Sequence, residues 1–477
     1  MINKDLKCYI EDKISFSLTE EQSDVLQLLA DFLLQTDPNT AFLLKGYAGT
    51  GKTTIVGAVI RALQEQKRKV VLLAPTGRAA KVFSRASGCA AYTIHRKIYR
   101  QKVFDGTMDG FSLNDNLYHD TLFFVDEASM ISNAEGGDGG HFGSGRLLDD
   151  LIRFVASGKR CRLVLVGDDA QLPPVGTLES PALNRQRLEG YGLTVYAGTL
   201  TGVHRQMAES GILWNAAALR KQLFSDQLSG LPALKVSGFP DVVSISGETL
   251  IEELEQAYYQ CGMEETIVVT RSNKRANIYN QGIRGRILGR EELLTSGDWI
   301  IIAKNNYFWV DEETRKTTGL DFIANGDVAR VRKVRRHRNI YGFDFADAVL
   351  EFPDYGQIEL EVTIILNTLT SEAAALTRDE SDRLFHSVWE DYPEISNKKE
   401  RLKKIKSDGL FNALQVKFAY AVTCHKAQGG QWERVFVDQG YVGEDQSVGE
   451  YVRWLYTAIT RAKERVYLVN WPKNQLM

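Results

Sequence analysis

The 477-residue sequence contains few cysteines and no strong imbalance of charge. Its five cysteines are Cys8, Cys89, Cys161, Cys261 and Cys424, and no two of them form a CxxC pair. This scatter argues against a zinc site and a disulfide framework, and it is typical of reduced thiols in a cytosolic protein. The formal net charge is −3. No global basic field therefore indicates nucleic acid, although a local basic groove can still bind phosphates.

Long apolar runs are also missing from the sequence. No stretch reaches the length of about 18 apolar residues that a membrane-spanning helix needs. The first 17 residues are rich in charged side chains and have no apolar core, so we expect neither a signal peptide nor a membrane association. Hydrophobic residues make up 44% and charged residues 25% of the chain, which is ordinary globular composition. The length allows roughly two to four domains.

Short apolar segments alternate with helical patterns in the first part of the chain. Unbroken apolar segments of this kind predict strands of a parallel sheet that is buried on both faces. These strands are expected at residues 41–44, 70–73, 121–125 and 162–166. Helical patterns between them, such as 53–66 and 147–156, predict an α/β doubly wound domain.

A second α/β pattern appears later and is interrupted. Its expected strands are 266–269, 415–421, 435–438 and 465–469, with helices at 274–288 and 448–460. Short strands with turn signals at 293–369 predict an inserted β-barrel, and the polar stretch 371–407 predicts a projecting helical arm. We therefore expect a first domain over 1–198, a second domain over 199–290 and 411–477, and an insertion over 291–410.

One glycine-rich segment follows an apolar strand and opens a helix, which is the context of a phosphate-binding loop. The segment, here called the phosphate loop, reads Gly46-Tyr47-Ala48-Gly49-Thr50-Gly51-Lys52-Thr53. Glycines let backbone N–H groups curl around phosphate oxygens, and the helix N-terminus adds donors. We expect Lys52 to reach the β- and γ-phosphates of ATP and Thr53 to bind Mg²⁺. The expected nucleotide contacts are Gly46, Ala48, Gly49, Thr50, Gly51, Lys52, Thr53 and Thr54.

Two further strand ends carry polar residues that suit hydrolysis. Asp126 and Glu127 follow the strand at 121–125. Asp126 is expected to hold Mg²⁺ directly or through water, and Glu127 to orient or deprotonate the attacking water. Gln171 follows the strand at 162–166 and is expected to sense the γ-phosphate or that water. Together with the phosphate loop, these residues predict ATP hydrolysis.

The order of these three segments resembles helicase superfamily one. Five more segments look like its motifs Ia, Ib, IV, V and VI, namely 74–80, 93–95, 200–206, 422–429 and 456–462. The set extends from near residue 18 to the C-terminus. Its details resemble the RecD-like branch, with the phage Dda type most similar in size and order and the Pif type a near neighbour.

The resemblance implies two RecA-like domains with ATP at their interface and 5′-to-3′ movement on single-stranded DNA. It implies that Gln22 contacts adenine, that Gly430 contributes to nucleotide binding, and that Arg205 and Arg461 act as arginine fingers. Such fingers are worth ~10³–10⁵ in rate. It also implies a monomeric, cytoplasmic, bacterial or phage-like protein that works at junctions of single and double strands in replication, repair or recombination. A single-strand-binding protein is an expected partner.

Nucleic acid should be held by phosphate contacts and stacking platforms without reading of sequence. Pro75, Thr76, Gly77 and Arg78 are expected to contact phosphates. His95 and His425 could bond phosphate or stack on bases. The same motifs place Thr423 and Lys426 among the expected contacts.

A hairpin is expected within residues 97–118, because Asp105-Gly106 and Asp109-Gly110 are both turn signals. It resembles the pin with which RecD-like helicases split a duplex, with Phe104 and Phe111 near its tip. Base–aromatic stacking returns ~1–3 kcal/mol, against a mean of ~1.4 kcal/mol lost per DNA stack. In the alternative reading, both phenylalanines pack against a neighbouring domain.

Three other segments have less specific readings. The glycine-dense segment 136–145 predicts a surface loop rather than a ligand site. The basic segment 330–338 could guide DNA or form a solvated face, and the basic run 398–406 could be a solvated helix or contact a partner.

Two alternative functions also fit the sequence. One is an ATPase clamp that binds nucleic acid without unwinding it. The other is a RecD-like subunit of a larger repair or recombination complex.

Overall fold

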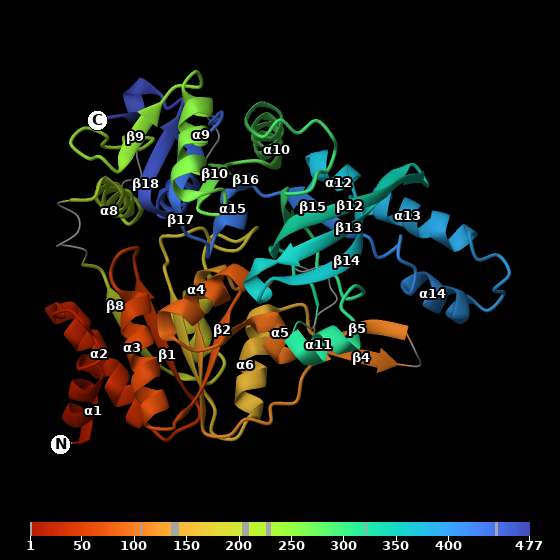
Figure 1. Cartoon of the computed structure of the whole chain (residues 1–477). Coiled ribbons are helices and arrows are strands. Elements are labelled where there is room, and N and C mark those ends of the chain that lie inside the picture. The colour runs from red at the N-terminus through yellow and green to blue at the C-terminus, as the bar shows by residue number, and fades with distance from the viewer. Residues whose placement is uncertain are drawn as a thin grey trace.

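The first RecA-like domain occupies the lower part of Figure 1 and is built on a six-stranded parallel sheet. The computed structural model describes residues 2–104, 107–134, 143–202, 209–225, 230–318, 320, 322–443 and 447–477. In spatial order the strands are β3 (Ala91–Thr93), β2 (Lys69–Ala74), β6 (Thr121–Val125), β7 (Arg162–Gly167), β1 (Thr40–Gly46) and β8 (Thr194–Leu200). The parallel sheet that the apolar segments predict is thus confirmed.

Helices cover both faces of this sheet. Along β1, Phe42 and Leu44 pack into the core on one face, while Ala41 and Leu43 pack into the core on the other. A strand buried on both sides has no polar face, which is why its sequence does not alternate. The helices of this domain are α1 (Ile2–Glu11), α2 (Glu20–Leu34), α3 (Lys52–Glu65), α4 (Gly77–Ser87), α5 (Ile94–Ile98), α6 (Leu147–Ser157) and α7 (Arg185–Glu189).

The second RecA-like domain lies above the first and contains a five-stranded parallel sheet. Its strands, in spatial order, are β16 (Ala421–Thr423), β10 (Thr266–Thr270), β17 (Trp432–Asp438), β18 (Ala462–Val469) and β9 (Val242–Ile245). Its helices are α8 (Gly211–Leu223), α9 (Leu250–Cys261), α10 (Asn273–Gly282), α15 (Cys424–Ala427) and α16 (Val448–Ile459). The helix expected over 274–288 ends as an α-helix at Gly282 and continues as a π-helical turn over Ile283–Ile287.

A closed five-stranded barrel is inserted into the second domain. Its strands are β11 (Trp299–Ile302), β12 (Val328–Ile340), β13 (Phe343–Phe352), β14 (Ile358–Ile365) and β15 (Leu414–Phe418). The single strand expected over 415–421 is divided, because β15 pairs with β11 and β14 whereas β16 pairs with β10. The barrel therefore continues past residue 410 to Phe418.

A buried ionic cluster ties the barrel to the second domain. Asp298, which is fully buried just before β11, accepts hydrogen bonds from Arg284 (3.0 Å), Arg290 (2.6 Å) and the Tyr420 hydroxyl (2.9 Å). Arg284 lies in the π-helical turn that ends α10, and Tyr420 lies between β15 and β16. Because a buried charge that loses its partners is costly, the cluster fixes both ends of the barrel on the domain that carries it.

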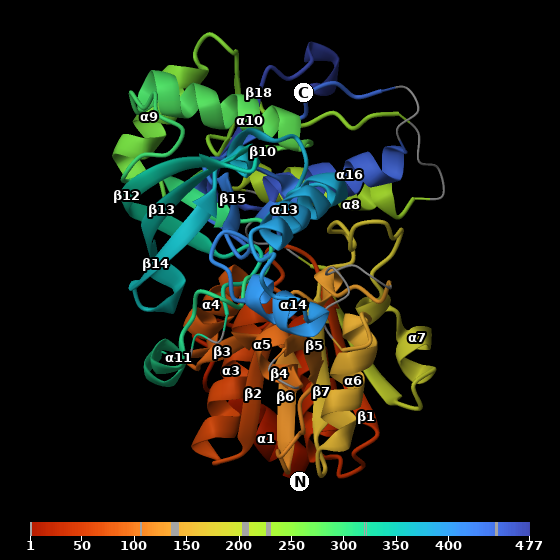
Figure 2. The same cartoon turned by 90° about the vertical axis from the view of Figure 1, so that its right-hand side faces the viewer.

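The helical arm is α13 (Arg378–Glu390) and α14 (Lys398–Lys406), preceded by the short α12 (Asn367–Thr370). Leu384, Val388 and Ile405 pack with Phe343 and Phe345 of β13 in one core, so the base of the arm is anchored on the barrel. In both views α14 lies beside the small hairpin of the first domain (Figures 1 and 2). The short helix α11 (Glu312–Thr318) lies between β11 and β12.

That hairpin is formed by β4 (Tyr99–Phe104) and β5 (Thr107–Leu113). Phe104 pairs with Thr107. The expected turn Asp105-Gly106 lies outside the described residues. The second expected turn, Asp109-Gly110, instead lies within β5 at a register shift. The side chains of Phe104 and Phe111 lie outside the described part of the chain, as does most of the glycine-dense segment.

Three arginines of the basic strand β12, Arg332, Arg335 and Arg338, pair with neighbouring carboxylates. Arg332 pairs with Glu351 on β13 at 3.0 Å, and Arg338 pairs with Asp347 on the same strand. These pairs offset part of the positive charge of the strand. All five cysteines are free. No helix within the described ranges is both long and apolar enough to cross a membrane.

Candidate nucleotide cavity and nucleic-acid groove

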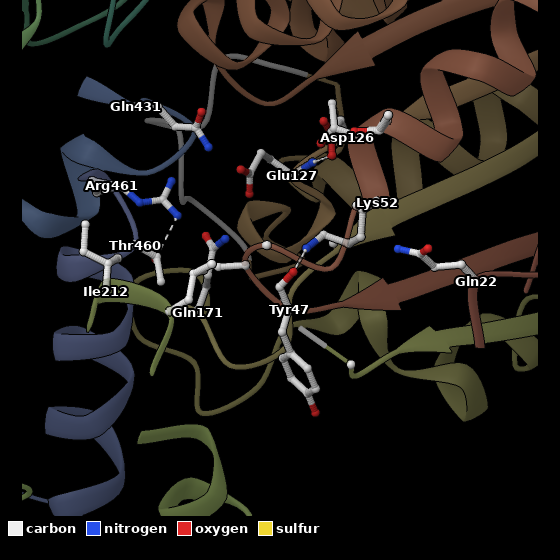
Figure 3. Close-up of a pocket in the computed structure, with 18 of the residues that line it drawn as sticks. Gln22, Tyr47, Lys52, Asp126, Glu127, Gln171, Ile212, Gln431, Thr460 and Arg461 are labelled. Carbon is white, nitrogen blue, oxygen red and sulfur yellow. Dashed lines mark hydrogen bonds between the residues drawn. The ribbon is translucent and has the colours of Figure 1, made fainter. Parts of the chain in front are cut away.

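A cavity of about 650 Å³ lies between the two RecA-like domains. Figure 3 shows Lys52, Asp126 and Glu127 on the side of the first domain and Arg461 and Gln431 on the side of the second. The expected residues that line it are Gln22, Ala48, Gly49, Gly51, Lys52, Thr53, Thr54, Asp126, Glu127, Gln171 and Arg461. The fold therefore brings most of the sequence-predicted site together from segments more than 400 residues apart.

The phosphate loop joins β1 to α3, as its sequence predicts. Gly49 and Gly51 have φ values of +76° and +85°, which strain any other residue. At Gly46 an added Cβ would lie 2.8 Å from Cγ of Lys52, so only glycine lets the lysine cross the loop. Lys52 Nζ donates a hydrogen bond of 2.8 Å to the carbonyl of Tyr47.

Two carboxylates follow β6 and line the same cavity. Glu127 adopts a left-handed backbone conformation (φ +51°), and its N–H donates to Oδ1 of Asp126 at 2.8 Å. Burial, and secondarily the neighbouring Glu127, raise the pKa of Asp126 to about 7. A desolvated carboxylate of this kind is stabilised by nearby positive charge.

The oxygen atoms around Asp126 suit a hard cation. Asp126 and the hydroxyl of Thr53 line one cavity, and Mg²⁺ takes oxygen ligands, usually one or two carboxylates with substrate phosphates and waters. No group of three or more His, Cys, Asp or Glu in the described ranges could hold a metal by itself. The donor set therefore fits a nucleotide-bound Mg²⁺ better than a free-standing metal centre.

Gln171 is buried between the two domains, and its side-chain Oε1 has no hydrogen-bond partner. Buried polar atoms are nearly always paired, so such an acceptor needs a water or ligand. Its position on the cavity wall agrees with a role near the attacking water.

Arg461 is held at the C-terminal end of α16, buried to 3% exposure. Its Nε donates to the carbonyl of Thr457 (3.0 Å), and its terminal nitrogens donate to the carbonyl of Gly430 (3.2 Å) and the hydroxyl of Thr460 (3.3 Å). Gly430 thus orients Arg461 and is not among the residues that line the cavity. The other expected finger, Arg205, lies outside the described residues.

Gln22 connects α2 to the phosphate loop. It forms a capping box with Thr19 at the start of α2, and its Nε2 donates to the carbonyl of Thr50 at 3.0 Å. This bond places the Gln22 amide on the cavity wall. The sequence did not single out the lining residues Phe16, Tyr47, Ile212, Gln431 and Thr460. Tyr47 lies inside the phosphate loop, Thr460 inside the segment that resembles motif VI, and Gln431 two residues after the segment that resembles motif V. The motifs were the only available signal for these three residues.

A second cavity of about 410 Å³, here called the groove, lies where both domains and the barrel meet. The first domain contributes Pro75, Thr76, Gly77 and His95, and the second contributes His425. These are five of the residues expected to contact nucleic acid. Burial lowers the pKa of the His425 imidazole.

The barrel supplies a third wall of the groove that sequence reasoning missed. This wall consists of Asn305, Phe322, Ala324 and Asn325, from the segment between β11 and β12. The approach is close, because an added Cβ at Gly77 would lie 2.8 Å from Oδ1 of the buried Asp327. Gly77 therefore permits the barrel to contact the N-terminus of α4.

Three expected nucleic-acid residues do not line the groove. The Arg78 guanidinium stacks on the Trp432 ring at 4.0 Å, across the domain interface. Lys426 Nζ is buried without a hydrogen-bond partner, and burial lowers its pKa to about 8. Thr423 precedes α15 and is half-buried.

Comparisons with known proteins agree with this arrangement. An AAA domain matches residues 17–223, and a UvrD-like helicase C-terminal domain matches residues 418–469. The ATP-dependent RecD2 DNA helicase of Deinococcus radiodurans is 26% identical over 473 residues, which cover 96% of this chain and 50% of that protein. The ATP-dependent DNA helicase dda of Enterobacteria phage T4 is 24% identical over 324 residues, 66% of this chain and 67% of the phage protein.

A solved structure of Pif1 helicase from Bacteroides in complex with ADP-AlF3 and ssDNA aligns with a TM-score of 0.47 at 14% identity, covering 97% of this chain and 95% of that one. The chain spans half the length of the RecD2 relative and 38% of an uncharacterised Methanocaldococcus jannaschii relative. Apart from Phe418 at the end of the barrel, the two matched segments lie in the two RecA-like halves whose facing residues form the nucleotide cavity. The chain therefore carries segments that match an AAA domain and a UvrD-like helicase C-terminal domain, and it is similar in sequence to the RecD2 and dda helicases.

Proposed function

We propose that the chain is an ATP-dependent DNA helicase that moves 5′ to 3′ along single-stranded DNA. One observation carries the proposal: Lys52, Asp126 and Glu127 of the first domain share a single cavity with Arg461 of the second. A site divided in this way is complete only when the domains approach, so nucleotide turnover is linked to domain movement. The RecD2 and dda relatives are both described as ATP-dependent DNA helicases.

The side chains have separable roles in hydrolysis. Lys52 binds the β- and γ-phosphates, and Arg461 stabilises the charge that develops on the γ-phosphate. Glu127 orients the attacking water and accepts its proton, while Gln171 holds that water or the γ-phosphate through its amide. Mg²⁺, held by Thr53 and Asp126 with the nucleotide, would neutralise phosphate charge.

The groove is the path we propose for single-stranded DNA. It meets the first domain at the N-terminus of α4, where free backbone N–H groups favour phosphate. His95 of the first RecA-like domain and His425 of the second both line it. A change in the distance between the domains therefore shifts one wall against the other and moves the strand. The β4–β5 hairpin is the candidate pin that meets the duplex.

Strand displacement on matched duplexes with a 5′ or a 3′ single-stranded tail tests this function. We expect ATP-dependent unwinding of the 5′-tailed duplex alone, and no turnover by Lys52→Ala. Activity confined to the 3′-tailed duplex would overturn the polarity. DNA-stimulated hydrolysis without any displacement would favour the clamp.

A further inference from the structure

One face of helix α16 contacts the first domain just behind the nucleotide cavity. Residues 453, 456 and 457 are three and four positions apart and so lie on the same side of the helix. Thr457 Oγ1 accepts a hydrogen bond of 2.9 Å from the N–H of Leu172. The Arg453 guanidinium donates to the carbonyls of Asp169 and Gln171. The second domain thus holds the backbone of the segment that follows β7.

Tyr456 lies in the middle of this face and reaches further into the first domain. Its hydroxyl accepts a hydrogen bond from the N–H of Ala48 at 2.9 Å and donates one to Oδ2 of Asp168 at 2.6 Å. Tyr456 and Asp168 are both buried, with 1% exposure each. A single hydroxyl therefore joins the phosphate loop, the strand end that leads to Gln171, and the helix that carries Arg461.

Both partners of this hydroxyl depend on it. Asp168 Oδ2 receives the Tyr456 donor, while Oδ1 is satisfied within its own turn by the N–H of Ala170 at 3.0 Å. When the second domain moves away, the Ala48 N–H and Asp168 Oδ2 lose their shared partner. An unsatisfied buried donor or acceptor is costly, so the loop and the strand end must then change shape or admit water.

We propose that Tyr456 is a positioning residue that couples the shape of the phosphate loop to the position of the second domain. The inference rests on the proposed ATP hydrolysis at this cavity. Because Tyr456 and Arg461 leave the same helix five residues apart, α16 positions the loop that binds phosphate together with the arginine that acts on it. When DNA binds in the groove and changes the arrangement of the domains, the Tyr456 hydroxyl transmits that change to the phosphate loop and so alters the affinity for the nucleotide.

Tyr456→Phe removes the hydroxyl and keeps the ring, and Tyr451→Phe is its matched control. Tyr451 is a fully buried tyrosine on the same helix, and its hydroxyl donates to Oε1 of Gln439 at 2.5 Å, inside the second domain. Both variants lose one buried hydroxyl, so they should melt at similarly lowered temperatures. Only Tyr456→Phe removes a contact between domains.

The decisive measurement is the affinity for a fluorescent ADP analogue with and without oligo-dT. Affinities of two coupled ligands change reciprocally. We expect the ratio of the two ADP affinities to fall toward one in Tyr456→Phe, with DNA-stimulated kcat reduced about tenfold or more. Tyr451→Phe should keep the wild-type ratio and kcat. A structural role alone would weaken ADP binding equally in both conditions and leave the ratio unchanged.

Asp168→Asn provides a second route, because it weakens the same bridge from the first domain without removing the tyrosine. It should also lower the ratio and the DNA-stimulated kcat. Wild-type ratios in both Tyr456→Phe and Asp168→Asn would overturn the coupling role while leaving the helicase proposal intact. Absence of ATP hydrolysis in the wild-type protein, or full turnover by Lys52→Ala, would instead refute the proposed function itself.

Discussion

The nucleotide cavity and the groove differ in the charge of their walls. Lys52, Asp126, Glu127 and Arg461 all line the nucleotide cavity. Among the described residues that line the groove there is no lysine, arginine, aspartate or glutamate, and the walls carry amides, small polar groups, apolar side chains and two histidines. Hydrolysis needs fixed charges aimed at a developing charge. A strand that must be released at every step is better held by backbone donors and stacking.

The largest effect should come from the nucleotide cavity alone. Arg461→Ala removes the charge that the second domain supplies, and we expect kcat for ATP to fall ~10³–10⁵-fold. Affinity for oligo-dT without nucleotide should stay within about twofold, because Arg461 does not line the groove. Phosphate-release kinetics would measure kcat, and fluorescence anisotropy would measure the affinity for oligo-dT. A parallel loss of both would show that the cavities are not functionally separate.

A smaller effect is expected at the hairpin, which contributes Tyr99, at its base, to the wall of the groove. Replacing Phe104 and Phe111 with alanine should leave DNA-stimulated ATP hydrolysis unchanged and slow strand displacement about tenfold, since one lost DNA stack costs ~1.4 kcal/mol. Stopped-flow unwinding of a 5′-tailed duplex would measure the rate. Unchanged unwinding would refute the pin and favour packing of both rings against a neighbouring domain.

DNA binding should depend modestly on pH through Lys426, which follows the groove residue His425 in sequence but does not itself line the groove. Burial lowers the pKa of Lys426 to about 8, so its ammonium is charged at pH 7 and largely neutral at pH 9. If Lys426 contacts a phosphate, raising the pH from 7 to 9 should weaken oligo-dT binding about fivefold, the worth of one solvated ion pair of ~1 kcal/mol. Lys426→Gln should flatten the profile. A profile that is equally steep in Lys426→Gln would assign the titration to another group.

The smallest effect should be the loss of affinity for oligo-dT as the salt concentration rises. A site that neutralises many phosphates loses ~10³–10⁵ in affinity between 50 and 200 mM salt. A groove whose described walls lack fixed cations should lose only about threefold over the same range, as expected for a single neutralised phosphate of a single strand. Anisotropy titrations with oligo-dT give the slope directly. A steep slope would show that the DNA follows a basic surface outside this groove.

The sequence predicts most of the nucleotide cavity because the reactive residues of this cavity lie in short, continuous motifs. Lys52, Asp126 and Gln171 each stand at the carboxyl end of a strand in one parallel sheet, and such ends meet at one edge. The apolar segments therefore predicted both the fold and the meeting of these residues. Gly46, Thr50 and Gly430 were exceptions, because none of them lines the cavity. The carbonyl of Gly430 instead accepts a hydrogen bond from Arg461.

The groove was predicted only in part because one wall depends on tertiary packing. Asn305 and Asn325 line the same cavity as Pro75 only because the barrel packs against α4, more than 200 residues away in sequence. No local pattern encodes that contact. The barrel boundary was missed for a similar reason: β15 and β16 are separated by two residues and look like one strand, although their partners lie in different sheets.

The buried cluster at Asp298 limits how many parts of this molecule can move independently. Both chain crossings between the barrel and the second domain pass through it, at Asp298 and at Tyr420. The barrel therefore moves with the second domain as one rigid body. Three independent domains could have two hinges, but this protein has one principal hinge, between the first domain and the body formed by the second domain and the barrel. Any rotation that narrows the nucleotide cavity also displaces the wall formed by Asn305 and Asn325 relative to α4. Weakening the Asp298 cluster should let the barrel move independently of the second domain. We therefore expect the length of DNA translocated per ATP hydrolysed to fall.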